Sequence, residues 1–263
     1  MKISVKTKGD IMNIAVITGA SSGLGWEFAK AVYNNRPDLD EVWVIARRQE
    51  RLQELQAELG NTIIPLAFDI TDPQAVLDYS NLLKEKDVDV KLLINNAGFG
   101  KLGSFDKLSL EENTRMVRLN CEALTAITAA TLPHMPEKSE IINSCSIASF
   151  APNTRMAVYS STKAYVMSLS RALREELKSR KINVLAVCPG PMDTEFLSVA
   201  NIQKGASRTF DTLPRVNAHT MALKSLRASR RGRAVYTNRI FYKFYRLLAK
   251  ILPHSLVMKL CGT

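Results

Sequence analysis

Apolar, β-branched runs alternate with helical periodicities along most of the chain. Near-continuous apolar strands separated by helices predict a parallel sheet that is covered on both faces, because crossover connections place helices there. Seven runs have strand character: 14–18, 42–46, 63–68, 90–95, 140–146, 182–188 and, more weakly, 233–237. Helical segments lie between them at 23–34, 49–59, 73–86, 109–132 and 157–180. The predicted fold class is α/β, a doubly wound, Rossmann-like sheet of about seven strands with helices on both faces.

The regular alternation indicates one domain over residues 1–263. No Pro- or Ser-rich linker, low-complexity tract or internal repeat divides the 263 residues. The regularity breaks at 191–232, a polar and basic connection that contains Pro191, Gly205, Pro214 and Gly232. Loops at the carboxyl ends of the strands line the ligand crevice in this layout. We therefore predict that 191–232 is a substrate lid.

Charge is concentrated at the end of the chain. The eleven Lys and Arg residues of 212–263, where no acid occurs, account for the whole net charge of +11. Such a segment suits nucleic acid, an anionic membrane surface or an anionic substrate, and it is also compatible with an ordinary solvated face. No helix-turn-helix, zinc-finger or RNA-binding signature accompanies it, so we predict no nucleic-acid partner.

Targeting and metal-binding signals are also absent from the sequence. No run reaches the ~18 apolar residues of a membrane-spanning helix. The N-terminus lacks the apolar segment and cleavage site of a secretory signal, and we interpret residues 1–11 as a leader or an upstream start choice. The cysteines have no metal-ligand spacing and are predicted to be reduced thiols in a cytoplasmic protein without a metal site: Cys121, Cys145, Cys188 and Cys261.

A glycine-rich turn follows the first strand directly and leads into a helix. It runs from Thr18 to Gly25 with the spacing T-G-x-x-x-G-x-G. Glycines let the backbone approach a pyrophosphate, whose charge is met by free N–H groups and the helix dipole. A tight strand-to-helix connection is the alternative for such a turn alone, but its context favours a nucleotide. The predicted cofactor contacts here are Gly19, Ser21, Ser22, Gly23, Leu24 and Gly25.

Four further motifs follow in order along the chain. They are Asn95-Asn96-Ala97-Gly98 after the fourth strand, Ser146 after the fifth, Tyr159-x-x-x-Lys163 on the next helix and Pro189-Gly190 after the sixth. Together with the glycine turn, they make residues 13–200 resemble the short-chain dehydrogenase/reductase family. The resemblance implies an enzyme that moves a hydride between a nicotinamide cofactor and a carbonyl or alcohol, and a homo-oligomer. It also implies cofactor contacts from Asp69, Ile70, Asn96, Ala97, Gly98, Tyr159, Lys163, Pro189, Gly190 and Thr194.

Tyr159 and Lys163 are four residues apart on a predicted helix and therefore share one of its faces. An ammonium group favours the phenolate, which brings a phenol pKa of ~10 closer to neutrality. For an isolated pair, a half-buried Tyr and an exposed Lys would be the alternative. Ser146 precedes Tyr159 by thirteen residues, and this interval favours it over its neighbours Ser144, Ser149 and Ser160. Both hydroxyls are predicted to reach one substrate oxygen, where Tyr159 exchanges the proton and Ser146 stabilises the alkoxide.

Asn120 and Asp69 each keep two interpretations. Asn120 lies in the predicted helix 109–132, where a mediocre helix former with a buried amide needs partners. Without the resemblance, a structural kink and a proton relay are equally good interpretations of Asn120. The resemblance implies that Asn120 holds a water that joins Lys163 to a proton relay. Asp69 either contacts adenine, as the resemblance implies, or caps the helix that starts near Asp72-Pro73.

The end of the second strand predicts which nicotinamide cofactor binds. An acid there would hold the ribose 2′-hydroxyl of NAD and repel a 2′-phosphate. This chain has Ala46-Arg47-Arg48 instead. Because guanidinium groups match phosphate in charge and geometry, Arg47 and Arg48 favour NADP(H) over NAD(H). Arginines that point into solvent at a helix start are the alternative.

The last segment, 239–263, predicts a basic amphipathic extension. Apolar residues follow helical spacing from Ile240 onward, and Lys243, Arg246 and Lys250 recur every three or four positions. The apolar stripe has three candidate locations: the protein's own substrate pocket, a homo-oligomer interface, or an anionic membrane surface. We favour packing on the domain or on a sister subunit, with peripheral membrane contact as the alternative.

The function predicted from these features is NADP(H)-dependent interconversion of a carbonyl and a secondary alcohol, in the reductive direction. Relatives that reduce acyl-carrier thioesters end soon after the last strand, whereas this chain continues. We therefore expect a lipophilic ketone, steroid-like or long-chain, rather than a 3-oxoacyl thioester. A non-catalytic nucleotide-binding or scaffold protein would be expected to have lost the Ser, Tyr or Lys of the site, and all three are present.

Overall fold

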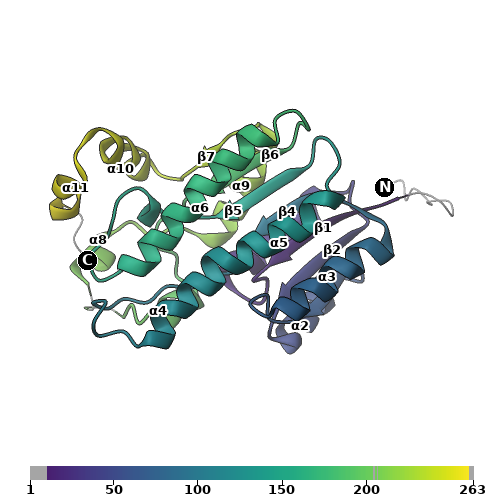
Figure 1. Cartoon of the computed structure of the whole chain (residues 1–263), viewed down its shortest axis with the longest axis horizontal. Coiled ribbons are helices and arrows are strands. Elements are labelled where there is room, and N and C mark those ends of the chain that lie inside the picture. The colour runs from purple at the N-terminus through teal and green to yellow at the C-terminus, as the bar shows by residue number, and fades with distance from the viewer. Residues whose placement is uncertain (1–10, 204, 206, 261–263) are drawn as a thin grey trace.

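A seven-stranded parallel sheet forms the centre of the protein (Figure 1). The computed structural model describes residues 11–203, 205 and 207–260, without the side chains of Arg208 and Leu260. The predicted leader, apart from its last residue, and Cys261 lie outside the described residues. The strand order is β3-β2-β1-β4-β5-β6-β7. The strands are β1 Met12–Thr18, β2 Glu41–Ala46, β3 Ile63–Ala67, β4 Val88–Asn95, β5 Glu140–Ser144, β6 Asn183–Val187 and β7 Val235–Tyr236. The predicted doubly wound fold is confirmed.

Both faces of the sheet are buried, as the continuous apolar strands predicted. Along β1, Ile14 and Val16 enter one hydrophobic core, whereas Ala15 and Ile17 enter another on the opposite face. Successive side chains of a strand point to opposite faces, so an uninterrupted apolar run needs two covered faces. The chain reverses its winding between β1 and β4, and a crevice opens there at the carboxyl ends of the strands.

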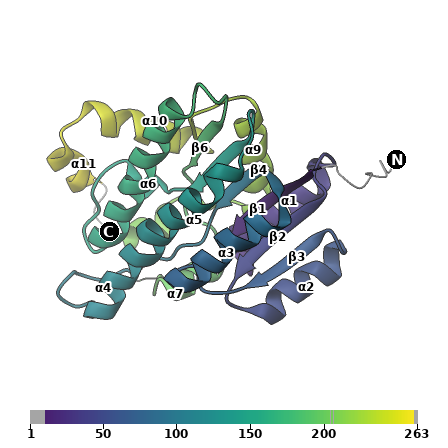
Figure 2. The same cartoon turned by 45° about the vertical axis from the view of Figure 1, so that its right-hand side comes forward.

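Helices cover the two faces in two groups (Figures 1 and 2). The core that contains Ala15 and Ile17 receives side chains from α1 (Gly23–Asn35), α2 (Gln49–Leu59) and α9 (Ala218–Arg230). The core that contains Ile14 and Val16 receives side chains from α3 (Pro73–Lys86), α5 (Leu124–Thr131) and α6 (Ala157–Glu176). The five predicted helical segments are all present, and α9 is an additional helix that the sequence pattern did not reveal.

Residues 191–232 are not one continuous lid. They contain α7 (Glu195–Val199) and α8 (Arg208–Thr212), and then α9, which packs on α1 and carries part of the core. The buried stripe of α9 consists mostly of small residues: Met221, Ala222, Ser225, Leu226, Ala228 and Ser229. The lid therefore stays a prediction only for the part before α9, which borders the crevice.

The predicted helix 109–132 is interrupted in its middle. It begins as α4 (Leu110–Val117), where Ser109 and Glu112 form a reciprocal capping box. A π-helical segment, Arg118–Ala123, then connects α4 to α5. Such a segment inserts one extra residue into the turn and changes the direction in which its side chains point. Asn120 lies inside this segment.

The C-terminal extension forms α10 (Ile240–Ile251) and α11 (His254–Leu260). Both helices lie at the end of the molecule far from the N-terminus in both views (Figures 1 and 2). Tyr242 and Ala249 are the buried residues of α10. Within the described residues, no helix combines the length and the apolar character needed to cross a bilayer.

Candidate active site

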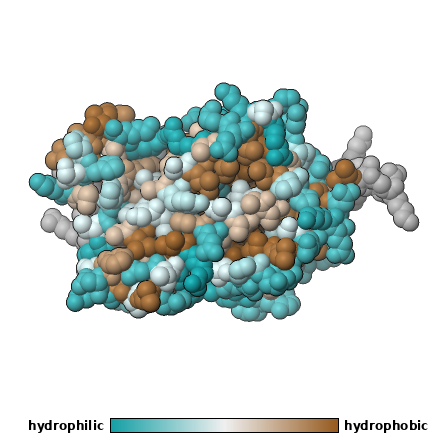
Figure 3. Space-filling view, in the orientation of Figure 1, coloured by the Kyte–Doolittle hydropathy of each residue, from teal (hydrophilic) through white to brown (hydrophobic). Residues whose placement is uncertain are grey.

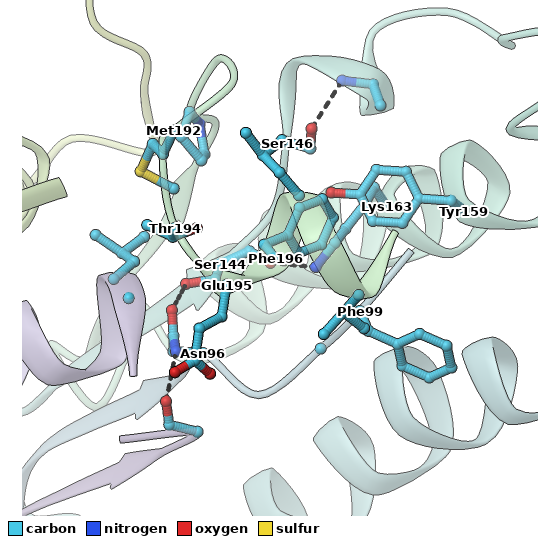
Figure 4. A pocket seen from close by; sticks show the side chains of 18 of the residues that line it. Asn96, Phe99, Ser144, Ser146, Tyr159, Lys163, Met192, Thr194, Glu195 and Phe196 are labelled. Atoms are coloured by element: carbon cyan, nitrogen blue, oxygen red, sulfur yellow. Dashed lines mark hydrogen bonds between the residues drawn. The ribbon is translucent and has the colours of Figure 1, made fainter. Parts of the chain in front are cut away.

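A cavity of about 790 Å³ opens at the carboxyl ends of the central strands (Figure 4). It is bordered by the glycine turn after β1, the ends of β2, β4, β5 and β6, and the segment that contains α7 and α8. Eighteen of the predicted site residues line it: Gly19, Ser21, Ser22, Gly23, Leu24, Arg47, Arg48, Asp69, Ile70, Asn96, Ala97, Gly98, Ser146, Tyr159, Lys163, Pro189, Gly190 and Thr194. Gly25 and Asn120 lie behind this wall.

The glycine turn fits a dinucleotide by its backbone. Gly19 and Gly23 have φ values of +68° and +54°, which favour glycine. A Cβ atom at Gly25 would lie 2.0 Å from the carbonyl oxygen of Gly19, so this position holds α1 close against the turn. Ser22 precedes α1 and its side chain makes no capping hydrogen bond, which leaves N–H groups of the first turn for an anion.

Two arginines and an acid lie at the end of β2, where an adenosine ribose would bind. Arg48 donates hydrogen bonds from Nη2 to Ser21 Oγ at 3.1 Å and to Glu195 Oε2 at 2.8 Å. Arg47 is more exposed, and its Nη1 lies 3.8 Å from Asp69 Oδ2. Both guanidinium groups border the cavity, and no acid occupies Ala46. This arrangement suits a 2′-phosphate.

Asp69 does not cap the next helix. Its Oδ1 accepts hydrogen bonds from Thr71 N and Thr71 Oγ1, at 2.9 and 2.8 Å, whereas Asp72 accepts from Gln74 N and caps α3. Burial would raise the pKa of Asp69, but the Thr71 hydrogen bonds and the Arg47 charge lower it overall. Asp69 is thus a fixed carboxylate at the cavity wall, and its contact with adenine stays a prediction.

The Asn96-Ala97-Gly98 segment is tied to the glycine turn. Thr18 Oγ1 accepts from the backbone N–H groups of Asn96 and Ala97 at 3.0 and 3.1 Å. Asn96 donates to Gly19 O at 3.2 Å and accepts from Ser144 Oγ at 3.1 Å (Figure 4). These bonds hold the ends of β1, β4 and β5 in one arrangement around the cavity.

Ser146, Tyr159 and Lys163 converge at the inner end of the cavity (Figure 4). Tyr159 and Lys163 share one face of α6 and are 7% and 5% exposed. Lys163 Nζ donates to the carbonyl oxygen of Ser144 at 2.8 Å and lies 5.8 Å from the centre of the Tyr159 ring. Ser146 lies two residues after the end of β5, and its Oγ accepts a hydrogen bond from Ala148 N at 3.1 Å. The three side chains are placed to surround one small polar group.

Burial dominates the electrostatics of this trio. It raises the pKa of Tyr159 well above its usual value, and hydrogen bonding to Ser146 opposes the shift only in part. Burial also lowers the pKa of Lys163. We expected Lys163 to bring the Tyr159 phenol towards neutrality, but the lysine does not offset burial here. Tyr159 is therefore held as a protonated phenol.

Asn120 supports the trio from behind. Its Oδ1 accepts from Phe99 N at 3.0 Å, and its Nδ2 donates to Phe99 O at 2.8 Å and to Thr162 Oγ1 at 3.0 Å. A Cβ atom at Gly98 would lie 2.9 Å from Asn120 Oδ1 and 3.4 Å from Lys163 Nζ. The π-helical segment thus places Asn120 beside Lys163, so the kink and a role near the lysine coexist.

The comparisons with known proteins agree with this geometry. A family model described as short chain dehydrogenase matches residues 13–205. The chain belongs to the short-chain dehydrogenase family. A probable NADP-dependent dehydrogenase from Haemophilus influenzae is 39% identical over 189 residues, which cover 70% of this chain and 74% of the relative.

Two further similar proteins have more specific descriptions. Serine 3-dehydrogenase from Agrobacterium fabrum is 35% identical to this short-chain dehydrogenase over 190 residues, 70% of this chain and 74% of the relative. A short-chain dehydrogenase from Sphingobium yanoikuyae, solved in complex with NADPH, has a TM-score of 0.76 and 29% identity, and the match covers 92% of this chain and 94% of that chain.

Most of the outer wall of this short-chain dehydrogenase site consists of residues that were not predicted from the sequence. Phe99 follows the Asn96-Ala97-Gly98 segment, Phe196 lies on α7, and Phe210 lies on α8. The Phe196 ring centre is 5.7 Å from that of Tyr159, so the wall reaches the reacting end. The only available signal for Phe196 was its position two residues after Thr194.

Glu195 and Tyr242 were also not predicted as site residues. Glu195 connects α7 to Arg48, and hydrogen bonding to Arg48 lowers its pKa. Tyr242 of α10 closes the cavity beside Gly190, where an added Cβ atom would lie 2.3 Å from the tyrosine ring. Its hydroxyl donates to Pro214 O at 2.7 Å. The C-terminal extension therefore packs on its own domain and borders the site, one of its three expected locations.

Proposed function

We propose that this short-chain dehydrogenase is an NADP(H)-dependent oxidoreductase that reduces a ketone to a secondary alcohol. The observation that carries the proposal is the meeting of a nucleotide-type glycine turn with Ser146, Tyr159 and Lys163 in one cavity. The sheet and the glycine turn account for a nucleotide-binding site but not for an activity. The buried Ser–Tyr–Lys trio indicates catalysis at a polar group of the substrate.

NADP(H) supplies the hydride acceptor or donor when it is bound. For the reductive step, the protonated Tyr159 phenol donates its proton to the substrate oxygen, and the Ser146 hydroxyl donates a hydrogen bond to the same atom as negative charge develops. Lys163 Nζ lies close to the Tyr159 ring, and this ammonium group would bind the ribose of the cofactor. At neutral pH the Tyr159 phenol is in the acid form that this step requires, because burial raises its pKa further above neutrality.

The 2′-phosphate selects the cofactor in this proposal. Arg47 and Arg48 present guanidinium groups at the cavity edge, and no carboxylate stands at Ala46 to repel a phosphate. The Haemophilus relative is described as NADP-dependent, and the Sphingobium structure contains NADPH. NAD(H) is the weaker cofactor for this site.

For the substrate we propose a lipophilic ketone, steroid-like or long-chain. The wall facing Tyr159 carries aromatic and aliphatic side chains from five separate segments: Phe99, Met156, Phe196, Leu197, Phe210, Phe241 and Tyr245. Such a wall gains most from a ligand that removes apolar surface from water. None of the described residues of the wall favours a long acyl thioester over a ketone.

A small hydroxy acid is the second candidate. The relative from Agrobacterium is a serine 3-dehydrogenase, and serine carries a hydroxyl group on C3 and a carboxylate at C1. Lys101 lines the cavity and is only partly compensated, since its Nζ lies 3.5 Å from Glu112 Oε1. This ammonium group would bind the carboxylate of such a substrate.

A paired panel distinguishes the two substrates. NADPH oxidation is measured with long-chain and steroid ketones and with 3-oxoacyl thioesters, and NADP⁺ reduction is measured with serine and other 3-hydroxy acids. We expect the highest kcat/KM with a lipophilic ketone, and Lys101→Met to leave that value within about twofold. Highest activity with serine, abolished by Lys101→Met, would establish the second candidate instead.

Assembly and location complete the proposal. We infer a homo-oligomer in the cytoplasm without a nucleic-acid partner. Phe105, Val117 and Tyr165 are exposed on and beside α4 and α6, and they offer an apolar contact surface there. Sedimentation velocity of the wild type and of Val117→Asp tests this: a monomer in both would contradict the oligomer.

A further inference from the structure

The outer face of α10 is an exposed apolar surface. Four apolar residues of this face are 52% to 84% exposed and recur at positions i, i+4, i+7 and i+11, so they form one line along the helix. We call this line the outer stripe: Ile240, Phe244, Leu247 and Ile251. Tyr242 and Ala249 on the opposite side of α10 are buried against the domain. A helix that is already anchored thus presents a second apolar face outward.

Basic side chains border the outer stripe. Lys243 and Lys250 are exposed and lie one turn or less from stripe residues, along the same edge. No acidic residue follows Asp211 in the chain. In the space-filling view, apolar residues gather at the end of the molecule that carries α10 and α11 (Figure 3). Large apolar side chains beside uncompensated lysines are typical of helices that lie in a membrane interface.

The other edge of the stripe leads to the cavity. Phe241 is 53% exposed and also lines the cavity wall. Leu256 of α11, 44% exposed, adds a further outward apolar side chain near this end. The outer stripe and the cavity wall therefore lie side by side on α10.

We propose that the outer stripe docks this protein on an anionic lipid bilayer, with α10 lying in the plane of the interface. Its apolar side chains enter the acyl boundary, and Lys243 and Lys250 contact lipid phosphates. The cavity then opens towards the bilayer along Phe241. This docking is a property of the surface and does not depend on which reaction the site performs.

Charge decides between a bilayer and a second copy of the chain. In a two-fold symmetric contact through α10, each subunit would present the same acid-free basic segment to the other. Like charges facing each other across an interface disfavour association, whereas anionic headgroups attract them. The bilayer satisfies the apolar stripe and its lysines together.

Vesicle sedimentation tests the proposal with the full-length protein. Vesicles of neutral phosphatidylcholine are compared with vesicles containing phosphatidylglycerol, at low and high salt. We expect binding only to the anionic vesicles. Phe244→Ser with Leu247→Ser should reduce the partition coefficient by on the order of 100-fold, because two large apolar side chains no longer leave water. Lys243→Glu with Lys250→Glu should reduce it by at least about 25-fold, at about fivefold for each basic group.

Matched controls separate the outer stripe from general surface properties. Leu110→Ser removes an apolar side chain that is 82% exposed on α4, and Lys107→Glu with Lys178→Glu reverses two exposed lysines outside the basic segment. Both controls should bind like the wild type. The proposal is overturned if the protein does not bind anionic vesicles. It is also overturned if the control charge reversal weakens vesicle binding as much as Lys243→Glu with Lys250→Glu does. A dimer that dissociates in Phe244→Ser with Leu247→Ser, without vesicle binding, would identify a second copy as the occupant.

Discussion

Two parts of the cavity are built on different physical principles. We call them the cofactor region, which comprises the glycine turn, the ends of β2, β4 and β5 and the Ser146–Tyr159–Lys163 trio, and the substrate region, which is the apolar wall. In the first, glycines with restricted geometry and hydrogen bonds such as Thr18 to Asn96 fix the backbone around a charged ligand. In the second, interchangeable apolar side chains from α7, α8 and α10 form a wall. Polar geometry leaves few residue choices at fixed spacing, whereas an apolar wall accepts many sequences.

The largest expected effect lies in the cofactor region. Tyr159→Phe removes the proton donor but none of the phosphate contacts, so turnover should fall by about 10²- to 10⁴-fold while NADPH affinity changes little. Lys163→Met should weaken both. Steady-state kinetics and NADPH fluorescence titration measure the two effects. Retention of more than about a tenth of wild-type turnover in Tyr159→Phe would refute the acid assignment.

The next largest effect concerns the preference of the cofactor region for NADPH over NADH. Ala46→Asp combined with Arg47→Ser should lower the NADPH-to-NADH ratio of kcat/KM by about 10- to 100-fold, because one change repels the 2′-phosphate and the other removes a charge-assisted hydrogen bond. Arg231→Ser, an exposed arginine outside the cavity, serves as the control. An unchanged ratio in the double variant would show that Arg47 points away from the cofactor.

The pH profiles of the two directions should differ. The raised pKa of Tyr159 keeps the phenol protonated between pH 6 and 8, so reduction should be nearly independent of pH there. Oxidation requires the phenolate, whose fraction rises about tenfold per pH unit below the pKa, and its kcat should rise accordingly. Initial rates in both directions test this. An oxidation rate that levels off near neutrality would indicate that Lys163 lowers the phenol pKa in the working enzyme.

Single residues of the apolar wall should matter less. Phe210→Ala removes part of the substrate contact, and we expect KM for a lipophilic ketone to rise about 5- to 10-fold with kcat and NADPH affinity nearly unchanged. Leu77→Ala, on α3, removes an apolar side chain that is 53% exposed and outside this cavity, and should leave all three quantities unchanged. A loss of NADPH affinity in Phe210→Ala would mean that the two regions are not separable.

The smallest effect concerns the contact between the regions. The Glu195 carboxylate pairs with Arg48 at the proposed phosphate position. Glu195→Gln removes a negative charge there, so NADPH should bind about two- to fivefold more tightly, as expected for a half-exposed pair. Glu54→Gln, on α2, is the control. Weaker binding in Glu195→Gln would show that this carboxylate positions Arg48 instead of competing for it.

The same contrast explains what the sequence could predict. The strands were predicted correctly from their uninterrupted apolar runs. The glycine turn, Ser146, Tyr159 and Lys163 line one cavity, as their order along the chain predicted, because motifs that follow parallel strands meet at the same edge of the sheet. Their roles stay predictions. Helix α9 was missed because its buried stripe is rich in Ala and Ser, while its basic residues dominated the pattern. The π-helical segment at Asn120 has no periodicity signal of its own. The Tyr242–Gly190 contact joins residues 52 positions apart, and no local pattern encodes it.

Transfer of label from a deuterated cofactor tests the central claim most directly. The protein is incubated with NADPH that carries deuterium at both C4 positions and with a lipophilic ketone, and the alcohol product is analysed by mass spectrometry. The account predicts one deuterium on the carbinol carbon of each product molecule, at a rate that falls by about 10²- to 10⁴-fold in Tyr159→Phe. Product without deuterium, or equal rates in both proteins, would contradict it.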